Sequence, residues 1–182
     1  MLNARLLKGM MVFLCGGHLS LLAGMDSAYT KIDTTHCTVI ASDRGVADSS
    51  VSKCQPYAGI DVLVEYGDAR DDIVLVRKGK PYYLDLQRHI SWAFSMLGDT
   101  IEWRFPSKKP YQPVAMIVRF NAQDKIDKKG MPSNVSYLVV TKITDKEICI
   151  VGKIDPVRNQ NLKARDMADR ASTMACLKER QE

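Results

Sequence analysis

Motifs for metal binding and nucleophilic catalysis are missing from the 182 residues of this chain. No C-x-x-C or H-x-x-x-H pair occurs, which excludes the common zinc spacings. The nucleophile-elbow pattern G-x-S-x-G is absent, and Asp68, Asp71 and Asp72 lack the spacing of a calcium loop, so we interpret them as part of a turn. The sequence therefore predicts no metal site, no cofactor and no catalytic residue.

Long apolar runs and a strong charge of one sign are also missing. The longest apolar stretch extends from Met10 to about Ala23 and is shorter than the roughly 20 residues that a membrane-spanning helix needs. The formal net charge is only +5, and the densest basic clusters, at residues 108–109 and 125–129, are short and typical of solvated loops. We therefore expect no nucleic-acid partner.

The N-terminal segment has the order of a secretory signal peptide. Arg5 and Lys8 form a basic end, the apolar stretch follows, and small residues gather between Ala23 and Ala28. We expect residues 1–28 to be a signal peptide, cleaved between Ala23 and Ala28, and residues 29–182 to form a single α+β domain. No stable membrane insertion is expected after this cleavage.

The cysteines indicate the compartment. The chain has five, and signal cleavage removes Cys15, leaving Cys37, Cys54, Cys149 and Cys176. An even number in an exported chain is typical of two disulfide bonds. Three pairings are possible, and we favour Cys37–Cys54 and Cys149–Cys176 because the members of each pair are near neighbours in sequence. Since disulfides require an oxidising compartment, the sequence predicts a periplasmic or secreted protein.

Alternation of apolar and polar residues, which is typical of half-buried strands, dominates the middle of the chain. The clearest examples are "IDVLVEY" at residues 60–66 and "TIEWRF" at residues 100–105. Four further strands are expected, at residues 73–77, 114–120, 136–143 and 147–154. The polar region 29–54 is expected to be a long loop clipped by the first disulfide, with one short strand in "THCTVIA" as an option.

The C-terminal region changes its period. From Asn159 to Lys178 the apolar residues recur at steps of three and four, which predicts one amphipathic helix. We therefore expect an α+β fold, in which an antiparallel, twisted sheet of about six strands carries one long C-terminal helix and is stapled by disulfides. A β-sandwich with a terminal helix is the alternative. The sequence does not indicate an oligomeric state.

Several segments together resemble a known family. "GDTIEWRF", "AMIVRF" and "CIVGKID", followed by "ARDMADRA" and a last cysteine, are similar to a family of small exported alphaproteobacterial proteins of unknown function. The resemblance covers residues 37 to 176 and implies a signal peptide, paired cysteines, an I-E-W-R strand and a closing helix, but no activity. The chain departs from the family at residues 55–59, "QPYAG", where Pro and Gly are expected directly after the second cysteine.

Charged residues on the expected sheet are candidate contacts for a ligand or a partner. Glu102 and Arg104 share the strand face opposite Trp103. Arg119 lies on another expected strand and would join them if the two strands are neighbours in the sheet. An arginine fork in this position can bind a carboxylate or phosphate group. Alternatively, opposite charges on one sheet face pair with each other.

The two tryptophans, Trp92 and Trp103, are expected in the hydrophobic core. If Trp92 is instead exposed beside Phe94, we expect it to anchor a protein contact, because exposed aromatic side chains tend to mark interfaces.

Binding to another macromolecule is the function that the sequence favours. An exported, non-enzymatic protein, effector-like or inhibitor-like, with a protein partner in the periplasm or outside the cell, fits a stapled sheet with charged loops. A small hydrolase is one alternative, using a carboxylate pair of Glu102 with Asp99 or Asp124. A carrier of a small ligand at the sheet–helix interface is another.

Overall fold

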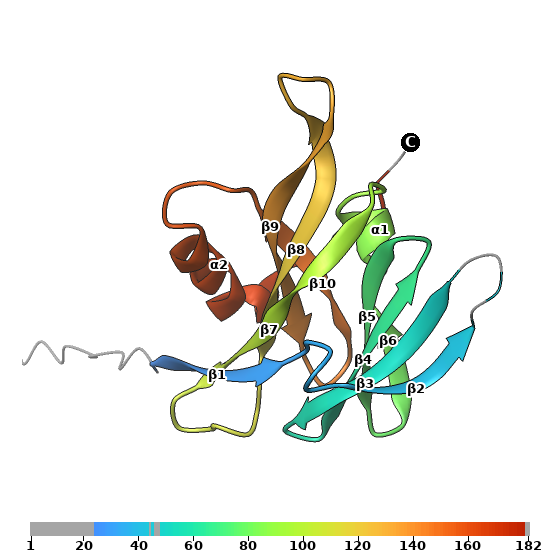
Figure 1. Ribbon diagram of the computed structural model, residues 1–182. Coiled ribbons are helices and arrows are strands. Elements are labelled where there is room, and N and C mark those ends of the chain that lie inside the picture. The colour runs from blue at the N-terminus through green and yellow to red at the C-terminus, as the bar shows by residue number, and fades with distance from the viewer. Residues whose placement is uncertain (1–23, 44, 46–47, 181–182) are drawn as a thin grey trace, which may run out of the picture.

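A computed structural model describes residues 24–43, 45 and 48–180 of the chain (Figure 1). Most of the predicted signal peptide, including Cys15, therefore lies outside the described residues. The elements in chain order are β1 (Met25–Lys31), β2 (Thr38–Asp43), β3 (Ser49–Tyr57), β4 (Ile60–Gly67), β5 (Arg70–Arg77), β6 (Lys80–Tyr83), α1 (Leu86–His89), β7 (Ser95–Pro106), β8 (Ala115–Ile126), β9 (Pro132–Ile143), β10 (Ile148–Ile154), α2 (Gln160–Asp169) and the 3-10 turn η1 (Ala171–Thr173).

All ten strands belong to one mixed sheet. Its order is β10-β9-β8-β7-β5-β4-β3-β2, with β1 paired to β7 and β6 paired to β5. Paired strands are antiparallel except β5 and β7, which meet in parallel at one residue pair, Arg70 and Ser95. The sheet thus has two antiparallel halves, β2–β6 and β1 with β7–β10, which are joined at this junction (Figure 1).

The main hydrophobic core draws on both halves of the sheet. Ile60 and Leu75 from one half are in the same buried cluster as Trp103 and Phe120 from the other. Trp103 is fully buried, as predicted, and its Nε1 donates a hydrogen bond to Thr30 Oγ1 at 2.9 Å. This bond satisfies the indole N–H, which would otherwise be buried without a partner.

A second, smaller cluster lies on the other face of β8 and β9, beneath α2. Ala115 and Ile117 on β8 pack there with Ala164 and Ala168 of the helix. Because β8 and β9 are buried on both faces, their sequences are nearly continuous apolar runs rather than strict alternations. The small alanines let α2 lie close to the sheet.

Three hairpins follow one another from β3 to β6, each with a two-residue turn. Both residues have positive φ in Ala58-Gly59, Asp68-Ala69 and Lys78-Gly79. Turns of this kind match the twist of antiparallel strands. The turn predicted around "GDARDD" is therefore shorter than expected, because Asp71 and Asp72 already belong to β5.

The two predicted disulfides, Cys37–Cys54 and Cys149–Cys176, are confirmed. Two disulfides indicate an oxidising, non-cytoplasmic location. Neither helix of the described ranges is long and apolar enough to cross a membrane.

The predicted fold class is wrong in the number of strands and in the length of the helix. The described residues form ten strands instead of about six, and α2 has ten residues rather than extending from Asn159 to Lys178. The alternative of a β-sandwich with a terminal helix is not supported either, because the strands form one mixed sheet.

Both errors have physical reasons. The region predicted as a loop holds β1, β2 and β3, and all six residues of β2 are exposed, so β2 has no buried face to create an alternation. The helix ends early because the chain runs on through η1 toward β10. There Cys176 bonds to Cys149, and the Leu177 amide donates to Ile150 O at 2.7 Å.

Candidate functional site

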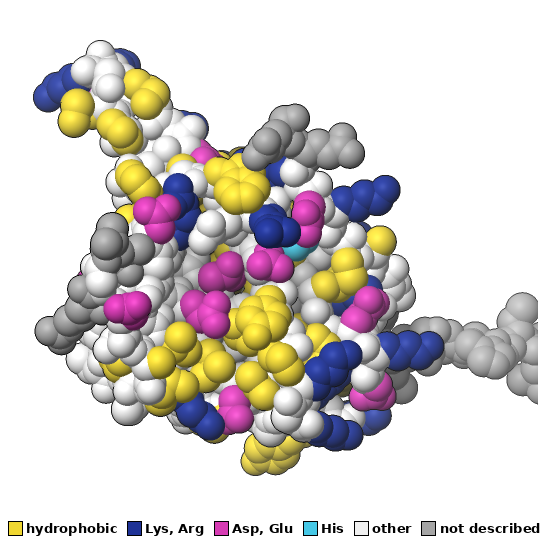
Figure 2. All heavy atoms as spheres, turned by 90° about the vertical axis from the view of Figure 1, so that its right-hand side faces the viewer, with side chains coloured by type: hydrophobic (Ala, Val, Ile, Leu, Met, Phe, Trp, Pro, Cys, Tyr) yellow, Lys and Arg dark blue, Asp and Glu magenta, His cyan; other side chains and the backbone are white. Residues whose placement is uncertain are grey.

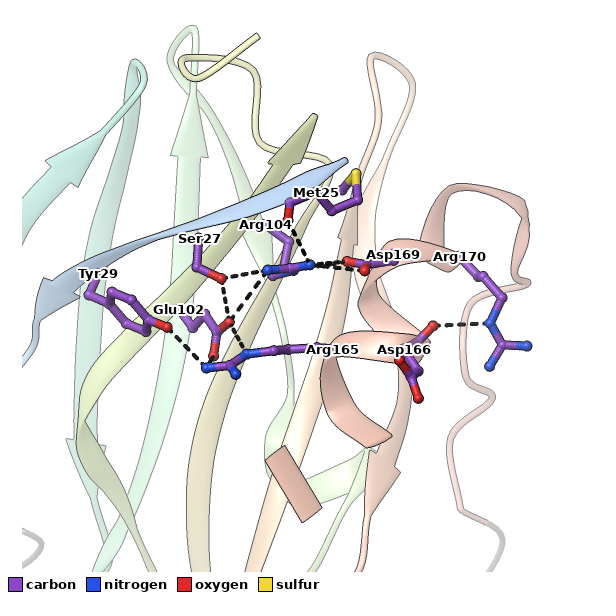
Figure 3. A network of polar contacts seen from close by, with 9 residues as sticks. All are labelled: Met25, Ser27, Tyr29, Glu102, Arg104, Arg165, Asp166, Asp169 and Arg170. Atoms are coloured by element: carbon purple, nitrogen blue, oxygen red, sulfur yellow. Dashed lines mark hydrogen bonds and ion pairs between the residues drawn. The ribbon is translucent and has the colours of Figure 1, made fainter. Parts of the chain in front are cut away.

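Arg104 on β7 is buried at the centre of a polar network between the sheet and α2 (Figure 3). Its Nε and Nη2 donate to the two carboxylate oxygens of Asp169 on α2, at 2.8 and 2.9 Å. Its Nη1 donates to Ser27 Oγ on β1 at 2.6 Å. A buried guanidinium needs such partners, and this fork holds the end of α2 against the sheet.

Glu102 lies two residues earlier on the same face of β7. It accepts hydrogen bonds from Ser27 Oγ at 2.6 Å and from Arg165 Nε at 2.7 Å. Arg165 Nη2 donates to the second carboxylate oxygen at 3.2 Å and to Tyr29 Oη at 3.0 Å (Figure 3). The hydrogen bond to Glu102 is the largest cause that raises the pKa of Arg165. Both oxygens of Glu102 therefore already have partners within the chain.

Glu102 and Arg104 thus follow the alternative in which charges pair with each other. Their helical partners, Arg165 and Asp169, were not predicted from the sequence. These two residues are four positions apart, a spacing that places both on one helix face and could have indicated a shared role. We assign this network to the joint between α2 and the sheet.

Arg119 on β8 lies in a cleft that is also lined by Glu102. Its contacts differ from those of Arg104 because all are neutral. The guanidinium donates to Ser136 Oγ at 2.8 Å, to Gln160 Oε1 at 3.2 Å and to Asn161 Oδ1 at 3.4 Å. Of the three predicted charged residues, Glu102 and Arg104 therefore have partners of opposite charge, whereas Arg119 has no acidic partner among the described residues.

The predicted carboxylate pair has no support from the geometry. Asp99 lines the same cleft as Glu102, but the oxygens of Glu102 are held by its own network. Asp124 on β8 accepts one hydrogen bond from Ser91 Oγ and one, at 2.7 Å, from Tyr137 Oη. Because Glu102 and Asp124 are both engaged within the chain, we do not carry the hydrolase hypothesis further.

Trp92 is exposed, so its expected place in the core is wrong. Its exposed fraction is 42%, and those of Phe94, Met96 and Tyr66 are 49%, 63% and 38%. Tyr66 lines three hollows. The first is also lined by Trp92, the second by Phe94 and Met96, and the third by Met96. The four side chains therefore form one continuous area, which we call the Trp92 surface.

Arg70, at the junction of β5 and β7, orients this surface. Its Nε donates to the carbonyl oxygen of Trp92 at 2.9 Å, and its guanidinium lies 5.0 Å from the centroid of the Phe94 ring. The same guanidinium pairs with the Asp68 carboxylate. The segment that carries Trp92 and Phe94 is thus fixed to the sheet rather than left as a free loop.

An acidic hollow of about 430 Å³ adjoins Trp92, with Glu65, Asp72 and Asp85 in its lining. Its two arginines are already engaged, Arg70 with Asp68 and Arg88 with Glu179. Within the described ranges, none of the three lining acids forms an ion pair of its own. Figure 2 shows acidic side chains gathered at the centre of the side that carries β2 to β6, with hydrophobic ones around them.

Asp72 in this hollow has a raised pKa of about 6. Burial is the largest cause, and the nearby charges of Asp85 and Glu65 add to it. Hydrogen bonds that the carboxylate accepts from the amides of Ile73, at 2.7 Å, and Leu86, at 3.1 Å, act in the opposite direction. The partly buried position of Asp72 on β5 was not predicted, because the surrounding sequence indicated a turn.

One group of potential metal ligands occurs among the described residues, namely Glu147, Cys149 and Cys176. The two sulfurs are bonded to each other, and a disulfide sulfur is a poor metal ligand compared with a thiolate. Glu147 forms an ion pair at 2.6 Å with Lys142. We assign these residues to the anchoring of the C-terminal segment.

Comparison with known proteins does not place the chain in a family. A scan against protein-family models and searches of curated proteins and of solved structures found no match. The resemblance to small exported proteins stays a prediction, and the Trp92 surface is the candidate functional site that the geometry favours.

Proposed function

We propose that this chain is an exported, non-enzymatic protein that binds a protein partner through the Trp92 surface, in the periplasm or outside the cell. The observation that carries the proposal is the exposure of four large, adjoining side chains, Tyr66, Trp92, Phe94 and Met96. Burial of apolar area against a partner contributes about 25 cal/mol per Å². Tryptophan and tyrosine are frequent anchors of protein interfaces, and an effector-like or inhibitor-like role fits such a surface.

The acidic hollow gives the chemistry of the partner. Glu65, Asp72 and Asp85 place negative charge next to Trp92 and Tyr66, whose ring faces attract cations. A lysine or arginine side chain matches both features, because its stem packs on the rings while its charge meets the carboxylates. We therefore expect the partner to present a basic residue flanked by apolar ones.

The two disulfides support export, and the N-terminal strand bears on the position of signal cleavage. Residues 25–28 form the first part of β1, and Ser27 belongs to the Arg104 network. Cleavage directly after Ala28 would remove these residues, so we propose cleavage upstream of Met25. Mass spectrometry of the protein from its native host tests this: a mature N-terminus before Met25 is expected, and one at Tyr29 would contradict it.

Site-specific photo-crosslinking in the native host tests the binding surface. A photoreactive amino acid at position 92 is expected to give an adduct of discrete mass with one protein. The control position is Tyr111, which is 78% exposed and lines none of the hollows that adjoin Trp92. The same adducts from both positions, or none from position 92, would contradict the proposal.

A further inference from the structure

A second cleft, of about 310 Å³, lies between α2 and the outer face of the sheet. Its apolar lining consists of Ile117 and Leu138 on the sheet and Ala164 on α2, whereas Tyr29, Lys31 and Arg119 are among its polar lining. This volume is at the lower end of the range for small-molecule sites, roughly 300 to 1,000 Å³. None of the residues of the Trp92 surface lines this cleft.

The charges that line the cleft do not balance. Arg165 and Glu102 neutralise each other. Among the described residues, Lys31 and Arg119 form no ion pair, and Lys31 Nζ donates only to the neutral Thr100 Oγ1, at 3.1 Å. With Asp99 as the one remaining acid, the lining keeps a net positive charge.

The guanidinium of Arg119 has donors to spare. A guanidinium carries five N–H donors. Nη1 donates to Ser136 and Gln160, and Nη2 makes one long bond to Asn161. The Nε–H and one Nη2–H therefore have no acceptor in the described part of the chain. Donors of this kind are suited to the paired oxygens of a carboxylate or phosphate group.

The backbone of β7 makes room for Arg119. The register between β7 and β8 shifts between Leu97 and Ile101, and Gly98 lies in this irregular stretch. A Cβ atom at position 98 would lie 2.9 Å from the Cβ of Arg119 and 3.4 Å from its Cγ. The glycine thus lets the Arg119 stem cross β7 closely, and the neutral partners fix the orientation of its head.

We propose that this cleft binds a small organic anion, whose carboxylate or phosphate group pairs with Arg119 while its apolar part contacts Ile117 and Leu138. Lys31 at the rim adds attraction. The neutral partners of Arg119 position the guanidinium without neutralising it, so its charge is left for the ligand. This site is separate from the proposed protein-binding function, and either proposal can fail alone.

Amide chemical shifts of the oxidised protein test the proposal. Titration with benzoate and with inorganic phosphate is expected to give saturable shifts at Gly98, Thr100 and Asn161. Benzylamine, which has a similar ring but the opposite charge, is expected to give none. Acetate is expected to bind more weakly than benzoate, because it lacks a ring to cover the apolar lining.

Variants identify the residues responsible. Arg119→Gln keeps hydrogen-bonding capacity without the charge and is expected to weaken benzoate binding at least tenfold. Lys31→Gln, at an exposed position, is expected to weaken benzoate binding two- to threefold. This variant tests the proposal if Arg119→Gln does not fold. The control, Arg170→Gln, alters an exposed arginine outside the cleft and is expected to have no effect. Unsaturable shifts with both anions, or wild-type affinity in both cleft variants, would overturn the proposal.

Discussion

The joint at α2 and the hollow beside the Trp92 surface both contain carboxylates and arginines, but their carboxylates are used differently. At α2, Glu102 and Arg104 have partners on α2 and β1, and every charge of the joint meets an opposite one. At the Trp92 surface, aromatic rings are exposed and the carboxylates of the adjoining hollow have no ion-pair partners within the described ranges. Charges that satisfy each other stabilise a fold, whereas unmatched charges beside exposed rings indicate a surface that is completed by another molecule.

Breaking the joint is expected to have the largest effect on stability. Arg104→Met keeps an apolar stem but leaves Asp169 and Ser27 without their guanidinium, and we expect a loss of about 3 kcal/mol in the free energy of unfolding. Arg165→Met, at a more exposed position, is expected to lose only about 1 kcal/mol. Urea unfolding measures both, and equal losses would contradict the central position of Arg104.

The C-terminal segment links the two regions. After Cys176 it passes β10 and reaches α1, where the Arg180 amide donates to Arg88 O and Arg180 Nη1 to Ile90 O, both at 3.0 Å. We expect the double variant Cys149→Ser/Cys176→Ser to lose about 3 kcal/mol of stability. Thermal unfolding measures the loss.

Hydrogen exchange separates the anchoring of this segment from general destabilisation. In the variant without Cys149–Cys176, faster exchange of the Arg180 and Leu177 amides is expected. The matched control without Cys37–Cys54 is also expected to be destabilised. In this control, the Arg180 amide is expected to exchange as slowly as in the wild type, provided that it exchanges through local opening rather than through global unfolding. Unchanged protection in both variants would contradict a link through this disulfide.

The unmatched acid Asp72 is expected to make stability depend on pH. Its pKa of about 6 in the folded protein lies above its ordinary value of 3.8. The contribution of Asp72 to the free energy of unfolding is therefore fully present below pH 3.8 and is lost as the pH rises through 6. Relative to Asp72→Asn, the wild type is expected to lose about 2 kcal/mol between pH 4 and pH 6.5. Parallel curves of unfolding free energy against pH for the two proteins would refute this.

A substitution in the turn beside the Trp92 surface is expected to have the smallest effect on stability. Ala69 has a φ of 56°, a left-handed conformation that glycine adopts without strain, and its carbonyl oxygen accepts a hydrogen bond from Ser95 N. Ala69→Gly is expected to stabilise the protein by up to about 1 kcal/mol. The control Ala41→Gly, in the exposed strand β2, is expected to destabilise it by about 0.5 to 1 kcal/mol. A stability loss in both variants would be evidence against strain at Ala69.

Much of the local pattern was predictable from the sequence. Both disulfides, the buried Trp103 and the alternating strands β4 and β7 follow from cysteine spacing and from apolar periodicity. These features depend on residues close together in the chain. The shared face of Glu102 and Arg104 was predicted for the same reason.

Features that depend on distant contacts were not predictable. The partners of Arg104 lie on β1 and α2, at positions 27 and 169, and local periodicity does not bring these positions together. All residues of the strand β2 are exposed, and after α2 the chain turns toward β10, where the second disulfide holds it. Tryptophan is usually at least partly buried, and the contact that fixes the Trp92 backbone, from Arg70 Nε to the Trp92 carbonyl oxygen, joins positions 22 residues apart in the chain.

The decisive measurement is the affinity of the crosslinked partner for the wild type and for two variants. Trp92→Ala is expected to weaken binding at least tenfold, whereas Tyr111→Ala is expected to leave the dissociation constant within twofold of the wild type. Unfolding curves confirm that the variants are folded at the temperature of the titration. Wild-type affinity in a folded Trp92→Ala variant would contradict the assignment of this surface to partner binding.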